Sequence, residues 1–388
     1  MISKCRYPLS IFTLLLFTAC SESQPPAEEA SNTDAEQPTA VTQETVVAAA
    51  SNIEASAPTG DCVDEDNITY LCGPQNAEDV LRIGNSQWLL VSGMNGELVN
   101  NAAINGKIHL VNHVEKTWEV LFPGENPNLA QDMQMFSSCP GPLDVTNFSA
   151  HGIALQQQES GPERYRLYMT SHGAREAIEV FELDAFVKPT IKWVGCVPMP
   201  ATSWTNSITV LKDGGFFATQ FMDPTGSGMA GVTAGEVTGH VFEWHPGGEV
   251  TVLAGTELSG PNGIVMTDDE RYLYVAAFGT HEVVRFDRSS NPPAKESVSI
   301  SVAPDNIRWN SDGNLYTAGG NVTDACSGPV CGTGWSVIEI VPFTMTAKRI
   351  TGVDETAAMQ GVSSALLVDD EIWIGTYGGE RLGILPKP

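Results

Sequence analysis

Residues 303–318, APDNIRWNSDGNLYTA, contain an acidic residue two positions before an aliphatic one, then an Asp-Gly turn, then a strand of alternating Leu and Tyr type. The same succession of strand, turn and strand recurs five more times, at 78–93, 151–172, 206–221, 262–278 and 360–378. Repeats of this length in a chain of short strands are typical of a β-propeller, in which each repeat forms one blade. We therefore predict an all-β fold, a six-bladed β-propeller.

One column of polar residues stands two positions before the aliphatic residue in every copy. Its members are Glu78, His151, Asn206, Asn262, Asp305 and Gln360. The first strand of each propeller blade lines the central channel, so this column predicts a ring of side chains around the axis. The alternative is that Asn, Asp and Gly stand there only as turn formers.

Most of the ring offers oxygen atoms. The expected metal ligands are Glu78, Asn206, Asn262, Asp305 and the adjacent Asn306, of which two are carboxylates. Oxygen-rich sites of high coordination number suit calcium, so we predict a central Ca²⁺. His151 and Gln360 complete the circle.

The intervals between copies are uneven. The longest, 73 residues, separates the first two copies and contains the segment 123–143 with Cys139. We expect this segment to form a loop over one mouth of the propeller. The best helix candidate in the folded part, 128–136, lies inside it and is short.

The first twenty residues read as an export signal. Lys4 and Arg6 precede a short apolar run at 11–17, followed by Thr18-Ala19-Cys20. That run is far shorter than the roughly 20 residues of a membrane span. The pattern resembles a bacterial lipoprotein signal over 1–19, which implies a lipid on Cys20 and an anchor in the outer membrane facing the periplasm. An ordinary cleaved signal is the alternative.

Residues 20–59 predict an acidic, flexible tether, because they carry seven acidic residues, no Lys or Arg, and few groups able to form a core. The propeller domain is expected over 60–388, with no other run long enough to cross a membrane. The net charge of −27 argues against a nucleic-acid partner, which needs a basic face. The residues leave the oligomeric state open.

Six cysteines remain after Cys5 and Cys20, an even number that indicates disulfides in an exported chain. Two pairs close short loops, Cys62 with Cys72 and Cys326 with Cys331. This leaves Cys139 with Cys196. The pairing is a preference among fifteen possible arrangements, and none of the spacings resembles a zinc site.

The repeats resemble the six-bladed propellers related to senescence marker protein and gluconolactonase, and within them the paraoxonase or arylesterase branch. The motifs that carry the resemblance run through nearly all of the folded part. They are Glu78-Asp79, the His-Gly-Ile at His151, His172 one strand later, the asparagines Asn206 and Asn262, and the pair Asp305-Asn306.

This resemblance implies a catalytic calcium held by the five oxygen ligands, beside a His151–His172 pair, and hydrolysis of lactones and aryl esters. Calcium would act as a Lewis acid on the carbonyl, and His151 would activate water while His172 orients it. The alternatives are a channel-capping role for His151 and a structural role for His172. Trp204, Phe221 and Trp335 are expected in the aromatic wall.

Several positions depart from the paraoxonase pattern. Ser207 stands where that branch has an Asp that helps to hold a second calcium, so a second site at Asp79 and the backbone of Ile153 is in doubt. Thr219-Gln220-Phe221 replaces an Asn-Asp-His cluster, so aryl-ester and organophosphate hydrolysis do not follow. No cysteine after Cys331 can tie the last strand to the first.

Two other functions remain open. A sugar lactonase of the gluconolactonase type would use the same ring without the histidine pair. A lipid-anchored propeller in the cell envelope could instead serve as a binding platform without turnover, because the fold does not determine the reaction.

Overall fold

The computed structural model describes residues 62–65, 67–96, 105–322, 334–354 and 359–388. The predicted signal, the tether with Cys20, and the pair Cys326 and Cys331 lie outside these residues. None of the described helices is long and apolar enough to span a bilayer.

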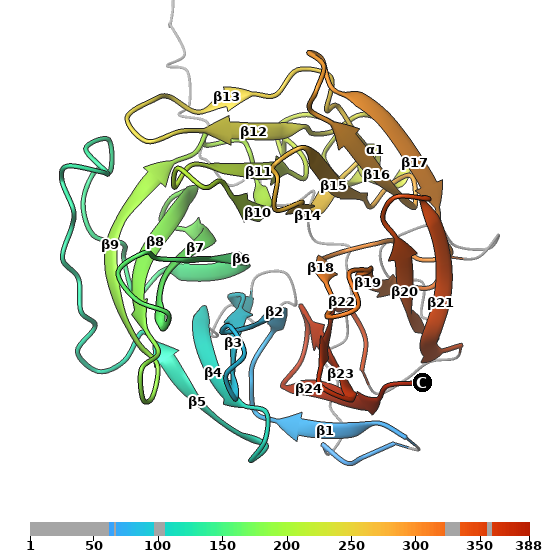
Figure 1. Ribbon diagram of the computed structural model, residues 1–388, viewed down its shortest axis with the longest axis horizontal. Coiled ribbons are helices and arrows are strands. Elements are labelled where there is room, and N and C mark those ends of the chain that lie inside the picture. Colours follow the sequence, from blue (N-terminus) through green and yellow to red (C-terminus); the bar gives the residue numbers. More distant parts are fainter. Residues whose placement is uncertain (1–61, 66, 97–104, 323–333, 355–358) are drawn as a thin grey trace, which may run out of the picture. The chain divides into compact units, whose positions relative to one another are not determined.

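Six four-stranded antiparallel sheets surround a common axis, which confirms the predicted six-bladed propeller (Figure 1). Blades 1 and 2 comprise β2 (Ala77–Arg82), β3 (Trp88–Gly93), β4 (Lys107–Asn112), β5 (Thr117–Phe122), β6 (Phe148–Gln157), β7 (Arg164–Gly173), β8 (Ala177–Asp184) and β9 (Thr190–Pro198). Blades 3 and 4 comprise β10 (Thr205–Val210), β11 (Phe216–Gln220), β12 (Val241–Trp244), β13 (Thr251–Val252), β14 (Pro261–Met266), β15 (Tyr272–Ala277), β16 (Glu282–Asp287) and β17 (Ala294–Ser299). Blades 5 and 6 comprise β18 (Ile307–Trp309), β19 (Leu315–Gly320), β20 (Trp335–Val341), β21 (Thr346–Val353), β22 (Val362–Val368), β23 (Glu371–Thr376), β24 (Arg381–Pro386) and β1 (Thr69–Cys72).

The ring of blades is closed by hydrogen bonds between the two ends of the propeller. β1 pairs antiparallel with β24, so that Thr69 lies opposite Ile384 and Cys72 opposite Arg381. The amino-terminal strand therefore supplies the outer strand of blade 6. This strand pairing closes the ring of blades, a role for which the sequence offered no disulfide.

The predicted column lies on or just before the innermost strand of each blade. Glu78, His151, Asn206 and Asn262 lie within that strand, and Asp305 and Gln360 lie two residues before it. The inner strands β2, β6, β10, β14, β18 and β22 contact one another in that order, and β22 returns to β2. In four of them the pairing with the next strand is interrupted at the column position, for example between Ala77 and Asp79 and between Thr205 and Ile208. A β-bulge redirects a side chain. Here the bulges fall where the column side chains lie at the axis.

The glycines after His151 and Asn262 are required by close approach between neighbouring inner strands. A Cβ atom on Gly152 would lie 2.5 Å from the carbonyl oxygen of Asn206. One on Gly263 would lie 2.4 Å from the backbone nitrogen of Ile307. Asn262 and Gly263 lie within β14, so the alternative that this pair is only a turn is wrong.

The segment 123–143 differs from the prediction. Residues 128–136 form no helix, because their backbone pairs with the outer strand of blade 2: Leu129 bridges to Trp193, and Ala130 N donates to Trp193 O (3.0 Å). None of the described residues of this segment lines the axial cavity. The short helix α1 (Gly228–Thr233) lies instead in the connection between β11 and β12.

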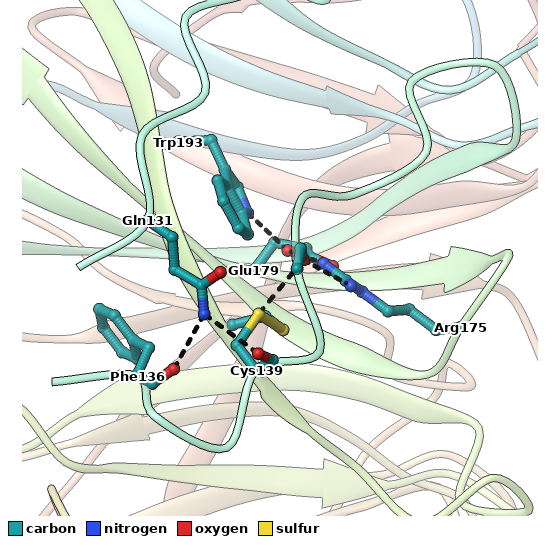
Figure 2. The surroundings of a disulfide bond; sticks show 8 residues. Gln131, Phe136, Cys139, Arg175, Glu179 and Trp193 are labelled. Atoms are coloured by element: carbon teal, nitrogen blue, oxygen red, sulfur yellow. Dashed lines mark hydrogen bonds and ion pairs between the residues drawn. A yellow bond between two sulfur atoms is a disulfide. The ribbon is translucent and has the colours of Figure 1, made fainter. Parts of the chain in front are cut away.

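Two predicted disulfides, Cys62–Cys72 and Cys139–Cys196, are confirmed. The second ties the 123–143 segment to β9, and Figure 2 shows Gln131 beside it, donating to the carbonyl oxygens of Phe136 (3.1 Å) and Cys139 (3.0 Å). Glu179 lies beside the disulfide and accepts a hydrogen bond from Trp193 Nε1 (2.7 Å).

Removing the Cys139–Cys196 disulfide with paired Ser substitutions is expected to lower the free energy of unfolding by about 2–4 kcal/mol, because the bond closes a long loop in the unfolded chain. The matched control is the same change at Cys62 and Cys72. These cysteines are separated by 10 positions instead of 57, so loop entropy predicts a loss smaller by about 1.5 kcal/mol. Urea unfolding measures both, and equal losses would contradict the loop-entropy account.

Candidate functional site

A cavity opens on the propeller axis, lined by the predicted ring and by an apolar wall. The residues lining it are Glu78, Met94, His151, Trp204, Asn206, Phe221, Met229, Asn262, Phe278, Asp305 and Tyr377. Five of the six column residues are among them. The sixth, Gln360, is not among these described residues, and its carbonyl accepts a hydrogen bond from Thr376 Oγ1 (2.5 Å).

Four of the five expected ligands line this cavity, and the fifth, Asn306, contacts one of them, Glu78. Each of the five is at most 6 % exposed. Each also carries a buried side-chain oxygen with no hydrogen-bond partner: Glu78 Oε2, Asn206 Oδ1, Asn262 Oδ1, Asp305 Oδ1 and Asn306 Oδ1. Buried polar atoms without partners are rare because their desolvation is costly. Five such oxygens in one ring fit a bound cation.

Local hydrogen bonds orient these groups. Asn306 Nδ2 donates to Glu78 Oε1 (2.5 Å), which leaves the amide oxygen of Asn306 and the second carboxylate oxygen of Glu78 without partners. Asn306 N also donates to Ser363 O (2.8 Å), and Ser363 Oγ donates to Glu78 O (2.6 Å). Blades 1, 5 and 6 are thereby held together at the ligand ring.

The electrostatics of the ring also favour a cation. Burial, and then the nearby Asp305 and Asp79 carboxylates, raise the pKa of Glu78 well above its usual value. Burial raises the pKa of Asp305 to about 8, with Asp79 adding to the shift. A positive ion would offset both effects. Among the described residues no three His, Cys, Asp or Glu side chains form a metal-binding group. Three of the five expected ligands are amides.

The two predicted catalytic histidines are neighbours. His151 lies in β6 and His172 in β7, and His151 Nδ1 lies 2.8 Å from His172 Nε2. The other nitrogen of His151 faces the ring, 3.3 Å from Asn206 Nδ2 and 3.7 Å from Glu78 Oε1. Burial, and secondarily the neighbouring His172, lower the pKa of His151 well below its usual value. A neutral imidazole with one nitrogen toward the cavity can accept a proton.

At the expected second calcium site, Arg308 contacts both groups assigned to the ion, while Asp79 Oδ1 has no hydrogen-bond partner. A carboxylate oxygen of this fully buried residue accepts from Ile153 N (3.0 Å) and from the guanidinium of Arg308. Arg308 Nη2 also donates to Ile153 O (3.0 Å). The guanidinium of Arg308 therefore engages both groups assigned to the second ion. Burial raises the pKa of Asp79, and the Arg308 charge acts against that rise.

The wall of the cavity follows a second column that the sequence analysis did not use. Met94, Phe221, Phe278 and Tyr377 each come directly after the second strand of their blade, namely β3, β11, β15 and β23. His172 occupies the corresponding place in β7, opposite Ser149. Reading the position at the end of the second strand, or directly after it, in every copy would have found these residues.

Two predicted aromatic residues line the wall and one does not. The Trp204 ring packs edge-to-face against that of Phe221, with 6.0 Å between the ring centroids. Met229 from α1 completes the wall. Trp204 has a φ of 31°, a left-handed backbone conformation that is uncommon for a bulky residue. Trp335 was predicted here, but it is a core residue of blade 5, packed with Tyr316 and Val337.

Comparisons with known proteins agree with this fold. Residues 187–354 match the sequence model of the SMP-30/Gluconolactonase/LRE-like region. A gluconolactonase from Xanthomonas campestris has 19 % identity and a TM-score of 0.50, with 83 % of this chain and 89 % of that chain covered. A luciferin-regenerating enzyme has 12 % identity and a TM-score of 0.49 over 82 % and 94 % of the two chains. No curated protein matches the chain.

These similarities concern the fold and the SMP-30/gluconolactonase-like sequence pattern, which is typical of lactone-hydrolysing propellers. The likeness to the paraoxonase branch depends on the motifs of the chain itself.

Proposed function

We propose that this chain is a calcium-dependent lactonase for hydrophobic lactones. The observation that carries the proposal is the ring of five buried oxygens without partners beside the ring nitrogen of His151. The matched SMP-30/gluconolactonase-like region supports hydrolysis of a lactone as the reaction class.

Glu78, Asn206, Asn262, Asp305 and Asn306 would hold the ion. When bound, calcium would supply polarisation of the lactone carbonyl and stabilisation of the oxyanion. The residues of the chain supply the proton transfers. His151 Nε2 accepts a proton from water as the water oxygen attacks the carbonyl carbon. The same nitrogen returns a proton to the leaving alkoxide when the ring C–O bond breaks, which yields a hydroxy acid.

The cavity lining favours a hydrophobic lactone over a sugar lactone. Beyond the ring and His151, the lining consists of Met94, Trp204, Phe221, Met229, Phe278 and Tyr377, with no Arg or Lys among the described lining residues. A polyhydroxylated substrate would lose hydrogen bonds to water against such a wall. An alkyl or aryl group would gain about 0.8 kcal/mol for each methylene that it buries.

The test is hydrolysis of a substrate panel by the purified protein: a long-chain γ-lactone, an aromatic lactone, glucono-1,5-lactone and phenyl acetate. We expect kcat/KM for the long-chain lactone to exceed that for gluconolactone by on the order of tenfold or more, from burial of a few methylenes. Phenyl acetate measures the aryl-ester activity. Preference for gluconolactone would favour the sugar lactonase.

Chelation separates the enzyme from a binding platform. Removal of calcium is expected to abolish turnover, and its return to restore it. It should also lower Tm by about 5 °C, because a ligand at 100 times its Kd stabilises by about 2.7 kcal/mol. A drop in Tm without turnover on any lactone would support the binding platform. If the chelator changed neither the turnover rate nor Tm, the result would contradict the metal ring.

A further inference from the structure

Glu176 is a partly buried acid beside the histidine pair, outside the residues that line the cavity. It lies in the turn between β7 and β8, four residues after His172, and its side chain is 15 % exposed. Its two carboxylate oxygens have different partners. Oε1 lies 2.5 Å from His172 Nδ1, and Oε2 accepts from the backbone N–H of Thr205 (3.2 Å). Thr205 directly precedes the ring residue Asn206.

The surrounding contacts hold Glu176 in this position. Its carbonyl accepts from Met199 N (3.0 Å). The neighbouring Arg175 is directed away, with Nε and Nη2 bound to Glu179 (2.7 and 3.0 Å) and Nη1 bound to Gly141 O (2.9 Å), as Figure 2 shows for Glu179. Arg175 is therefore engaged elsewhere, and the Glu176 carboxylate faces two N–H donors.

The hydrogen bonds determine where the protons of the pair lie. An ionised carboxylate only accepts, so His172 Nδ1 must carry a proton and His172 Nε2 must present a lone pair. That lone pair faces His151 Nδ1 at 2.8 Å, so His151 Nδ1 must donate. His151 Nε2 is then the unprotonated nitrogen, directed toward Asn206 Nδ2 and the cavity. This is the nitrogen that a general base needs.

We propose that Glu176 is a positioning residue that selects the tautomer of both histidines and holds the basic nitrogen of His151 toward the substrate. The effect on rate rests on the proposed function, whereas the tautomer does not. When His151 Nε2 takes the proton of the attacking water, the positive charge is shared along the His151–His172 bond toward the Glu176 carboxylate. The proton returns from His151 Nε2 to the alkoxide, so Glu176 neither gains nor loses a proton in the reaction.

Glu176→Gln tests this directly. The glutamine oxygen can accept from only one of the two donors. The backbone N–H of Thr205 is fixed, whereas an imidazole can change tautomer, so the amide NH₂ should face His172 Nδ1. Both histidines then switch, and His151 presents N–H to the cavity. We expect kcat for the long-chain lactone to fall by about 10²-fold or more with KM changed by less than about threefold.

The decisive measurement is ¹⁵N NMR of the histidine rings, assigned with the His151→Gln and His172→Gln variants. The wild type should show protonated Nδ1 and unprotonated Nε2 on both rings, and Glu176→Gln should show the reverse. Glu182→Gln, an exposed acid on β8 that pairs with Lys192 (2.5 Å), is the matched control and should change neither the tautomers nor kcat.

Each outcome is decisive. Unprotonated His172 Nδ1 in the wild type would overturn the proposal even if the variant fails to fold. Unchanged tautomers in folded Glu176→Gln would overturn it as well. A switch of tautomer in a protein without lactonase activity would support the role of Glu176 and contradict the proposed reaction. A fall in kcat without a switch would assign Glu176 to some other contribution and overturn the positioning role.

Discussion

Replacing His151 by Gln is expected to lower kcat for lactone hydrolysis by about 10²- to 10⁴-fold, the contribution usual for a general base. The change removes the nitrogen that faces the cavity beside Asn206 and Glu78. None of the five oxygen ligands is altered, so the calcium content and Tm should stay close to those of the wild type. Steady-state kinetics, metal analysis and thermal unfolding measure the three quantities.

The matched control is His245→Gln. His245 is half exposed and pairs with Asp213 at 2.6 Å, away from the cavity lining. Its substitution should leave kcat unchanged. A fully active His151→Gln protein would remove His151 as the base. A variant that has lost its calcium would show that His151 acts mainly on the ligand ring.

Replacing Arg308 by Ala is expected to lower the free energy of unfolding by about 3–5 kcal/mol, because it leaves a buried charge without compensation. Asp79 is fully buried, and Arg308 supplies the cation that its carboxylate contacts. The variant also removes the donor to Ile153 O. Urea unfolding gives the change, and Tm should fall by roughly 10 °C.

Two variants make this prediction specific. Arg271→Ala breaks an Arg–Asp pair of 2.8 Å at the surface, where Arg271 is half exposed, and should cost no more than about 1 kcal/mol. In Asp79→Asn with Arg308→Met both charges are gone, and most of the lost stability should return. Failure of the double variant to recover would mean that packing, not charge, explains the role of Arg308.

Arg308 also sets the expected metal content. We expect one calcium per wild-type chain, because the guanidinium contacts both groups assigned to a second ion. Two ions per chain by metal analysis would contradict this. In Arg308→Ala, calcium that binds at Asp79 and restores Tm would show that the guanidinium takes the place of a cation there.

The repeats in the sequence predicted most of the fold and the ring of polar side chains at the axis. The aligned column identified Glu78, Asn206, Asn262 and Asp305 because propeller geometry brings the same position of every inner strand to one axis. It failed at Gln360, where the blade 6 side chain at the cavity is Tyr377. A second column at the ends of the second strands was present in the sequence, and it held four of the wall residues and His172.

Other features could not be read from the repeats because they depend on contacts between distant residues. The sequence of residues 128–136 favoured a short helix, but the bridge from Leu129 to Trp193 in β9 gives this stretch an extended start instead. Trp335 is an aromatic residue of the kind that could line the wall, but its side chain packs in the core of blade 5. Closure by β1 joins residues about 310 positions apart, a pairing that no local pattern specifies.

By itself, the sequence predicted the number of blades, the ring of polar side chains at the axis and a preferred pairing of the cysteines, because each depends on a periodic position or on a short count of cysteines. Only the tertiary structure decided that Arg308 neutralises Asp79 and that Glu176 faces His172. Both pairings depend on the direction in which the side chains point. They also lie away from bulk water, where an unpaired charge is costly. The paired atoms are brought together only when the ring of blades closes. The spacing of residues along the chain therefore does not predict these pairs.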